Sequence, residues 1–444
     1  MRQLPNPNNL LSQQTRTSCI KPAFHEIETP AYIFDLELLT DNLKYLHQLA
    51  EALDVKIIFA QKSYSLYSTY PLISKYLSGS TASGLYEAVL AHEEFPGEIH
   101  VYSPAYKTDD LIKLLEFADF VYFNSFGQWQ KHLAAINQAK KSGRKIQVGL
   151  RVNPEYSETE HDLYNPAGRF SRLGITAQVF EQGVAEYGLE GIDGLHIHAL
   201  CEENADSLAK VLTSFENNFS AYIGQMSWLN FGGGHHFTRA DYQVDLLADI
   251  LRNFRLKYPN QTIYFEPGEA ISLDTGYLVC EVLDIVQNEI NIAIVDTSAT
   301  CHMPDVLEMP YTPRVFLLDE KYCEGDFYIE AEAITDADLT NPEGAKTHNL
   351  YRLGAPTCLA GDIIGNYKFP RPLHINDRLV FCDMALYAHV KTNTFNGMPL
   401  PDLVTLKSPE KFEVERKATY FDFKNRLGSN GVKTLFNFEK GGFL

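Results

Sequence analysis

Residues Ile57–Tyr64, IIFAQKSY, run from four apolar side chains into Lys62 and two hydroxyl side chains. A short apolar run of this kind indicates a buried β-strand. A lysine at the end of such a strand has an ordinary interpretation, namely that the chain has reached the surface. We keep this interpretation open until the rest of the chain has been considered.

Short apolar runs recur along the chain and alternate with longer amphipathic stretches, such as LYEAVLAHEE from Leu85. Eight strands that alternate with helices over roughly 240 residues predict a (β/α)8 barrel of the α/β class. A doubly wound open sheet is the structural alternative, but no GxGxxG motif lies near the first strand. The runs begin at Lys56, Gly79, Glu98, Asp119, Ile146, Gly194, Trp228 and Thr262.

The pattern changes after about residue 272, where strand-like runs are separated by turns rich in Pro, Gly and Asn. Examples are YLVCEVLDIVQ from Tyr277 and DRLVFCD from Asp377. We therefore expect a barrel over residues 30–272 and a mostly β domain over residues 273–444. A strand from residues 1–29 is expected to join the second domain.

Composition excludes some classes of function. The formal charge of −19, from 57 acidic and 38 basic residues, disfavours nucleic acid as a partner and suits a cationic ligand; a charge kept for solubility explains it equally well. No apolar run is long enough to span a membrane, and the first thirty residues lack the apolar core of a signal peptide. Seven cysteines without a Cys-x-x-Cys pair indicate reduced thiols and a cytoplasmic protein.

Polar residues follow the predicted barrel strands. In barrels of this type the chemistry lies at the carboxyl ends of the strands, so these residues are expected to converge on one mouth. They are Lys62, Ser83, Arg151, His198, the triplet Gly232-Gly233-Gly234, and Glu266 with Gly268.

These residue types fit a site for pyridoxal phosphate. A lysine amine can hold the cofactor covalently through its aldehyde. The backbone N–H groups of a glycine triplet can cradle a phosphate, although such a triplet alone is more often a turn. A carboxylate such as Glu266 keeps the pyridine nitrogen protonated, and a histidine can stack on the ring.

A zinc site is the competing hypothesis. His196 and His198 point to the same side of a strand, and His235 and His236 lie nearby in sequence. This hypothesis leaves Lys62, the glycines and Glu266 without a shared role, so we expect no metal. His196 on its own is equally compatible with a buried core histidine.

From about Thr29 to Pro401 the chain resembles the alanine-racemase-like, fold type III pyridoxal phosphate decarboxylases, the family of eukaryotic ornithine decarboxylase and bacterial diaminopimelate decarboxylase. Within that family the carboxynorspermidine (carboxyspermidine) decarboxylase subgroup is the most similar. The motifs that carry the resemblance are LHIHALCEENAD from Leu195, LNFGGGHH from Leu229, FEPGEA from Phe265, DTSATCHMPDVLEMPY from Asp296, GAPTCLAGDIIGNY from Gly354 and VKTNTFNGMPLP from Val390.

The resemblance implies a role for several residues. Lys62 would be the lysine that binds the cofactor, His198 would stack on its ring, and Glu266 would pair with the pyridinium nitrogen. Tyr387 would bind the phosphate together with the triplet. With Ser83, Arg151 and Gly268, which come from the strand ends alone, the expected cofactor-binding set is Lys62, Ser83, Arg151, His198, Gly232, Gly233, Gly234, Glu266, Gly268 and Tyr387.

The resemblance also implies a homodimer with shared active sites, in which Cys358 reaches in from the partner subunit and donates a proton. Without the resemblance, Cys358 reads as a small buried residue. The implied catalytic residues are Lys62, Cys358 and His198.

Three positions depart from the better-known relatives. Ala199-Leu200-Cys201 stands where they have a phosphate-binding serine, Glu269 where they have an arginine, and Leu359 where they have a substrate-binding acid. These changes argue against ornithine, lysine or diaminopimelate as substrate and fit the carboxynorspermidine subgroup.

The resemblance therefore implies pyridoxal phosphate-dependent decarboxylation of carboxynorspermidine or carboxyspermidine, which differ by one methylene and are not separated by the sequence. The alternatives are a diaminopimelate or other diamino-acid decarboxylase and a non-catalytic homologue that binds the cofactor. The cationic arm of a polyamine-type substrate needs carboxylates, for which the candidates are Glu269, Asp305, Glu308 and Asp362.

Overall fold

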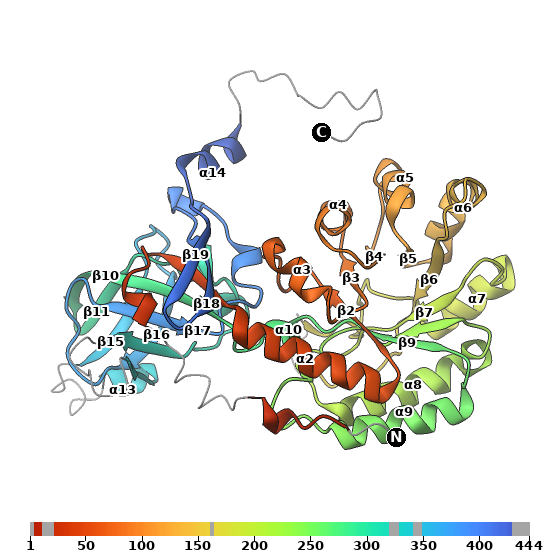
Figure 1. Ribbon diagram of the computed structural model, residues 1–444, viewed down its shortest axis with the longest axis horizontal. Coiled ribbons are helices and arrows are strands. Elements are labelled where there is room, and N and C mark those ends of the chain that lie inside the picture. Colours follow the sequence, from red (N-terminus) through yellow and green to blue (C-terminus); the bar gives the residue numbers. More distant parts are fainter. Residues whose placement is uncertain (1–3, 11–21, 160–163, 319–327, 341–348, 429–444) are drawn as a thin grey trace.

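Eight parallel strands close into a barrel in the computed structural model, which describes residues 4–10, 22–159, 164–318, 328–340 and 349–428 (Figure 1). Each strand pairs with its neighbour in chain order, and the last pairs with the first. All eight expected strands are confirmed. They are β2 Lys56–Ala60, β3 Gly79–Ala82, β4 Glu98–Tyr102, β5 Phe120–Phe123, β6 Gln147–Arg151, β7 Gly194–His196, β8 Trp228–Asn230 and β9 Thr262–Phe265.

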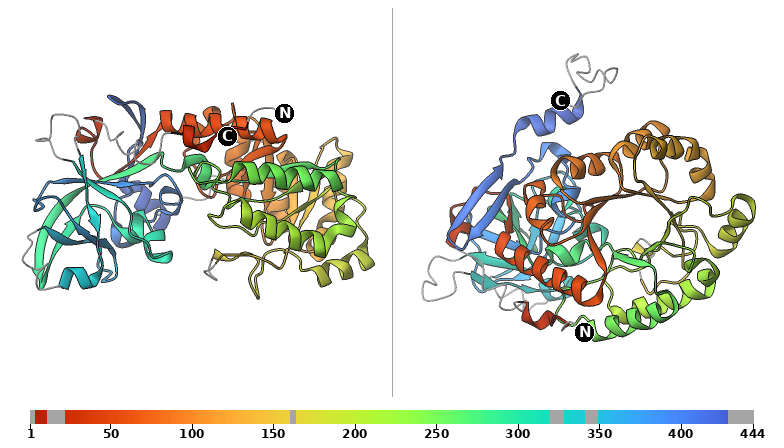
Figure 2. Two further views of the ribbon diagram at one scale, coloured as in Figure 1. Left: turned by 90° about the horizontal axis from the view of Figure 1, so that it is seen from below. Right: turned by 45° about the vertical axis from the view of Figure 1, so that its right-hand side comes forward.

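Helices cover the outside of the barrel, as the view along the barrel shows (Figure 2). Their apolar stripes pack against strands that are themselves buried on both faces, which is why those strands read as continuous apolar runs. The helices of this unit are α2 Leu36–Leu53, α3 Tyr70–Ile73, α4 Leu85–Glu94, α5 Thr108–Phe117, α6 Phe126–Lys141, α7 Ala177–Tyr187, α8 Ala205–Ile223, α9 Val244–Lys257 and α10 Glu269–Ser272.

Aromatic side chains fill much of the barrel interior. Phe120, Tyr122, Trp228 and Tyr264 form a buried cluster there with Ile58 of β2. Barrel interiors of this kind are usually filled by branched aliphatic side chains. The aromatic filling therefore brings hydroxyl and ring N–H groups into the core.

A second sheet lies beside the barrel. Its longest strand, β10, pairs with β1, β11 and β17, so it ties the domain together. The strands of this domain are β1 Ala31–Asp35, β10 Gly276–Asn288, β11 Ile290–Val295, β12 Val315–Leu318, β13 Tyr328–Glu330, β14 Glu332–Ala333, β15 Leu350–Gly354, β16 Ile363–Lys368, β17 Arg378–Cys382, β18 Asp402–Ser408 and β19 Lys411–Arg416; its short helices are α11 Ala299–His302, α12 Asp305–Glu308, α13 Asp336–Thr340 and α14 Tyr420–Lys424.

The strand that the N-terminal part of the chain adds to this sheet is β1, which lies just after the segment 1–29 in which we expected it. Its five residues are all buried between β10 and β18. Asp35 then caps α2, since its Oδ1 accepts hydrogen bonds from the N–H groups of Glu37 and Leu38 at 3.0 and 3.2 Å. The chain thus crosses from the sheet into the barrel at Asp35, and the boundary we placed at residue 30 is corrected accordingly.

None of the helices in the described ranges combines the length and the apolar character that crossing a membrane requires.

We predict that Gly194→Ala destabilises the barrel. A Cβ atom at this position would lie 2.1 Å from the indole ring of Trp228, which is itself buried in the interior. Overpacking of this kind lowers the free energy of unfolding by about 1–3 kcal/mol. Denaturant unfolding should therefore have its midpoint at a lower denaturant concentration. Gly127→Ala in α6 is the matched control because nothing lies within 4 Å of the added methyl group. Equal midpoints for both variants would contradict the prediction.

Candidate active site

A cavity of about 570 Å³ opens at the carboxyl ends of the barrel strands, and Tyr387 of the second domain reaches it. The backbone N–H of Tyr387 donates to the Ser63 carbonyl at 2.8 Å, which joins the two domains beside the cavity. The structure brings many of the predicted residues together here. Those that line the cavity are Lys62, Arg151, His198, Gly233, Gly234, Glu266, Gly268, Glu269 and Tyr387.

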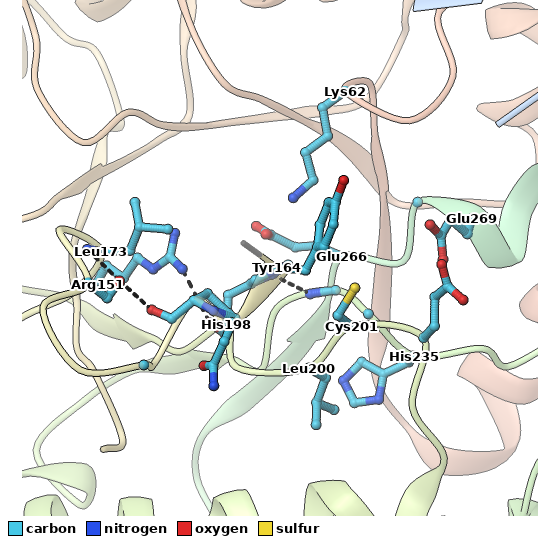
Figure 3. Close-up of a pocket in the computed structure, with 18 of the residues that line it drawn as sticks. Lys62, Arg151, Tyr164, Leu173, His198, Leu200, Cys201, His235, Glu266 and Glu269 are labelled. Carbon is cyan, nitrogen blue, oxygen red and sulfur yellow. Dashed lines mark hydrogen bonds between the residues drawn. The ribbon is translucent and has the colours of Figure 1, made fainter. Parts of the chain in front are cut away.

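Lys62 lies in the turn after β2 and points into the cavity (Figure 3). Its amine forms no hydrogen bond or salt bridge with any residue that the structure describes. The side chain is open to the cavity, but the cavity walls surround it and remove much of its hydration. This desolvation lowers the pKa of Lys62, although the negative charge of Glu266 acts in the opposite direction. A lysine with a lowered pKa has more of its amine in the neutral, nucleophilic form.

Glu266 follows β9 and is buried. Its Oε1 accepts a hydrogen bond from Nδ2 of Asn230 at 2.7 Å, and its Oε2 lies 3.4 Å from Nε2 of His196. Burial alone would raise the pKa of Glu266, but His196, His100 and the Asn230 amide together lower it to about 2. Glu266 is therefore an ionised carboxylate, the form that can pair with a protonated pyridine nitrogen.

The glycine triplet gives the backbone a conformation that other residues would not tolerate. Gly234 has a φ of 82°, and a Cβ atom there would lie 2.1 Å from the Leu200 carbonyl oxygen. The Gly232 N–H donates to Oδ1 of Asn230 and the Gly233 N–H donates to Nδ1 of His198, both at 2.9 Å. Among the described residues the Gly234 N–H has no partner, so it is the member of the triplet that is free to bind a ligand.

His198 is held at the cavity wall from two sides. Besides the bond from Gly233, its carbonyl oxygen accepts a hydrogen bond from Nη2 of Arg151 at 3.2 Å, and Arg151 lies over the ring of Tyr102 at 4.6 Å. Burial, Lys62 and Arg151 lower the pKa of His198 well below its usual value. The ring is therefore neutral and can pack against a flat aromatic ligand.

Two predicted cofactor residues lie outside the cavity lining. Ser83 is exposed, and its backbone N–H donates to the Glu87 carboxylate at 2.5 Å. Gly232 shapes the turn of the triplet, but its N–H is taken by Asn230. Within one chain, neither contacts the cavity.

Three predicted substrate-binding acids also lie outside the lining. Asp305 and Glu308 both form salt bridges with Lys391, the first at 2.5 Å. Asp362 is buried, and its oxygens accept hydrogen bonds from Ser298, Thr300 and Thr357. This set of partners gives Asp362 a structural role at the start of α11.

Cys358 is exposed on the loop between β15 and β16, away from the cavity of its own chain. Its backbone N–H donates to Oδ1 of Asn396 at 2.8 Å, which fixes the loop. The neighbouring Leu359 is 44% exposed, so this loop presents a thiol and an apolar side chain on the surface of the protomer.

Sequence reasoning missed the pairing of His236 with Glu269. Nε2 of His236 lies 2.6 Å from Oε2 of Glu269. Burial alone would lower the pKa of His236, but Glu269 outweighs it and raises the pKa. His236 thus pairs with the carboxylate that stands where the better-known relatives have arginine. The sequence signal that could have indicated this pair is the presence of His235 and His236 directly after the triplet.

Asn230 was also missed as a site residue, although it lies in a quoted motif. So was the segment from Tyr164 to Leu173, which lines the cavity with two arginines, Arg169 and Arg172. Asn230 stood out as a polar residue inside an apolar strand. Nothing in the pattern of residues 164–173 marks them as part of the site.

Two groups of side chains offer ligand atoms within 4.8 Å of one another, as a metal site requires: His196, His198 and Glu266, and Glu202, His236 and Glu269. In the first group Nδ1 of His198 already accepts a hydrogen bond from Gly233. A pyridoxal phosphate site would use this first group as well, and it would also give a role to Lys62 and the glycines.

The donor set fits pyridoxal phosphate. A desolvated amine without a partner, an ionised buried carboxylate and a free glycine N–H surround one cavity at the mouth of a parallel barrel. Both ring nitrogens of the buried His235 beside them also lack a partner among the described residues. This combination defines an enzyme of the barrel-fold, pyridoxal phosphate-dependent class.

Comparisons with known proteins agree with this class. A family model described as pyridoxal-dependent decarboxylase, C-terminal sheet domain, matches residues 31–385. The chain therefore belongs to the pyridoxal-dependent decarboxylases; it is a decarboxylase, and its cofactor is pyridoxal 5'-phosphate. The family resemblance seen in the sequence is confirmed.

Individual relatives cover almost the whole chain. The carboxynorspermidine/carboxyspermidine decarboxylase of Campylobacter jejuni is 41% identical over 403 residues, 91% of this chain and 99% of that protein. The carboxyaminopropylagmatine decarboxylase of Synechocystis is 37% identical over 408 residues, 92% of this chain and 97% of that protein. The crystal structure of carboxynorspermidine decarboxylase from Campylobacter jejuni, complexed with norspermidine, superposes with a TM-score of 0.76 at 39% identity, covering 90% of this chain and 100% of that chain.

We predict that borohydride reduction of the holoenzyme leaves the mass of the cofactor on the peptide that contains Lys62. The lowered pKa and the absence of a partner make this amine the reactive one in the cavity. Lys62→Arg should abolish the labelling, as peptide mass spectrometry would show. Lys56→Arg is the control because Lys56 is bound to Glu98 at the other end of the barrel. Labelling of another lysine in the unaltered protein would contradict the assignment.

Proposed function

We propose that the protein decarboxylates carboxynorspermidine or carboxyspermidine and releases norspermidine or spermidine, a step of polyamine biosynthesis. The observation that carries the proposal is the 41% identity to a carboxynorspermidine/carboxyspermidine decarboxylase over 99% of that relative's length. The sequence departures at Glu269 and Leu359 support it against diaminopimelate or another diamino acid.

The bound cofactor supplies an aromatic ring that accepts the electrons of the bond to carbon dioxide. The protein holds each part of that ring in place. The Lys62 amine would bind it covalently, the Glu266 carboxylate would keep a proton on its nitrogen, and the neutral His198 ring would pack against it. The Gly234 N–H and Tyr387, which line the same cavity, would bind its phosphate.

The proposed active site is completed in a homodimer. Cys358 and Leu359 are exposed and lie outside the cavity of their own chain. In the proposed dimer this loop enters the partner's cavity, and the Cys358 thiol donates the proton that replaces the lost carboxylate. Leu359 offers no charge at the position where an acid would bind a short diamino acid.

Carboxylates are proposed to bind the cationic arm of the substrate. Glu269 lines the cavity directly. Asp305 and Glu308 would take part by exchanging Lys391 for an amine of the substrate. Asp362, with three internal donors, is the weakest of the candidates.

A cytoplasmic location is part of the same proposal. It is supported by five cysteines that are free of disulfides in the described part of the chain.

A panel of substrates tests the proposed function. We expect the purified holoenzyme to release carbon dioxide from carboxynorspermidine and carboxyspermidine. It should be far slower with diaminopimelate, because Leu359 stands where an acid would bind that substrate. Carboxyaminopropylagmatine, the substrate named for the Synechocystis relative, should be included because it carries a guanidinium group on its arm. A preference for diaminopimelate or for carboxyaminopropylagmatine would overturn the assignment.

We predict that Lys62→Ala and Cys358→Ala complement each other when co-expressed with different affinity tags. Each variant alone should be nearly inactive. Lys62→Ala lacks the amine that binds the cofactor, and Cys358→Ala should protonate the product slowly and at the wrong position. In a dimer with shared sites, one site of each mixed dimer is intact, so random pairing restores roughly a quarter of wild-type activity. Purification over both tags isolates the mixed dimer.

Mixed dimers that are no more active than the two variants alone would show that Cys358 does not act across subunits. Clean product at the wild-type rate from Cys358→Ala alone would remove this residue from the reaction.

A further inference from the structure

A chain of polar side chains crosses the barrel interior below the cavity. It begins at Asn230, which is fully buried and does not line the cavity. Nδ2 of Asn230 donates to Oε1 of Glu266 at 2.7 Å and to Oη of Tyr122 at 3.2 Å. Oδ1 of Asn230 accepts the Gly232 N–H at 2.9 Å. One amide therefore contacts both the carboxylate for the ring nitrogen and the glycine triplet.

The chain continues from Tyr122 toward the opposite end of the barrel. Tyr122 Oη lies 2.5 Å from Nδ1 of His100, and Nε2 of His100 lies 3.3 Å from Oε2 of Glu98. Glu98 in turn accepts a hydrogen bond from Lys56 at 2.5 Å. Glu98 and Lys56 are the first residues of β4 and β2, so the chain ends at the amino-terminal rim.

The direction of every hydrogen bond in this chain follows from donor chemistry. An amide nitrogen only donates, so Tyr122 Oη accepts from Asn230 and has its single proton left for Nδ1 of His100. His100 then carries its own proton on Nε2, which faces the Glu98 carboxylate. Burial lowers the pKa of His100 and raises that of Tyr122, and both effects keep these groups neutral.

Ring packing holds this arrangement in place. His100 stacks on Phe120 with ring centroids 3.9 Å apart, and Tyr122 stacks on His196 at 5.1 Å. A reversed Asn230 amide would place an oxygen against Glu266 and an NH2 group against the Gly232 N–H. Both contacts would be repulsive, and Tyr122 would lose its donor.

We propose that Asn230 is a positioning residue that orients the Glu266 carboxylate which would pair with the ring nitrogen, and that it also fixes the glycine triplet. Tyr122 holds the Asn230 amide in the orientation that both contacts need. The inference rests on the proposed function only in that pyridoxal phosphate binds at this site; it does not depend on which substrate is decarboxylated. It names residues that touch neither substrate nor cofactor and that act through Glu266 and Gly232.

The test uses holoenzyme prepared with pyridoxal phosphate labelled with 15N in the ring, without substrate. In Asn230→Leu the ring-nitrogen resonance should move toward the unprotonated form. The affinity for the cofactor, measured by titration of the apoenzyme, should fall about 10–100-fold because a hydrogen bond to a charged group is lost. Tyr122→Phe should shift the resonance in the same direction and weaken cofactor binding about threefold to tenfold.

Tyr264→Phe is the matched control. It removes a buried hydroxyl from the same barrel interior, but one that accepts a hydrogen bond from Lys56 at the far end of the chain and makes no hydrogen bond with Asn230 or Tyr122. It should leave the resonance and the affinity unchanged. Thermal unfolding of all three variants separates this effect from general destabilisation, and Tyr122→Phe keeps the test decisive where Asn230→Leu does not fold.

An unchanged resonance in Asn230→Leu, or equal behaviour of Tyr122→Phe and Tyr264→Phe, would overturn the proposal. Because no substrate is present, a wrong substrate assignment would show only in the carbon dioxide assay and would leave these readouts unaffected.

Discussion

Closure of eight parallel strands into a barrel places all of their carboxyl ends at one rim. Side chains that lie far apart in the sequence, such as Lys62 after β2 and Glu266 after β9, therefore face the same cavity because β2 and β9 are hydrogen-bonded neighbours. The second domain covers part of this rim and contributes Tyr387. Without closure neither the cavity nor its charge distribution would exist.

The same desolvated cavity acts in opposite ways on its two central charges. It lowers the pKa of Lys62, which has no partner among the described residues, and by itself it would raise the pKa of Glu266. Glu266 stays ionised because Asn230 and the nearby histidines interact with it. A reactive amine and a stable carboxylate thus coexist because the barrel interior supplies donors to only one of them.

The sequence was sufficient to predict the barrel because strands buried on both faces appear as continuous apolar runs. It was also sufficient to place Lys62, His198 and Glu266 at one mouth, since topology alone brings strand ends together. It was not sufficient for contacts that depend on side-chain geometry between strands. The His236–Glu269 pair and the position of Asn230 between Glu266 and Tyr122 are contacts of this kind.

The charge balance at Glu269 connects the cofactor site with the proposed substrate. Where the better-known relatives have an arginine, this chain has a carboxylate paired with His236. The exchange removes one positive charge from the cavity wall, and the nearby Glu202 has its pKa raised by burial and by Glu269. A cavity wall with one cation fewer repels a cationic arm less, so a carboxylate at position 269 suits a substrate whose arm carries amines.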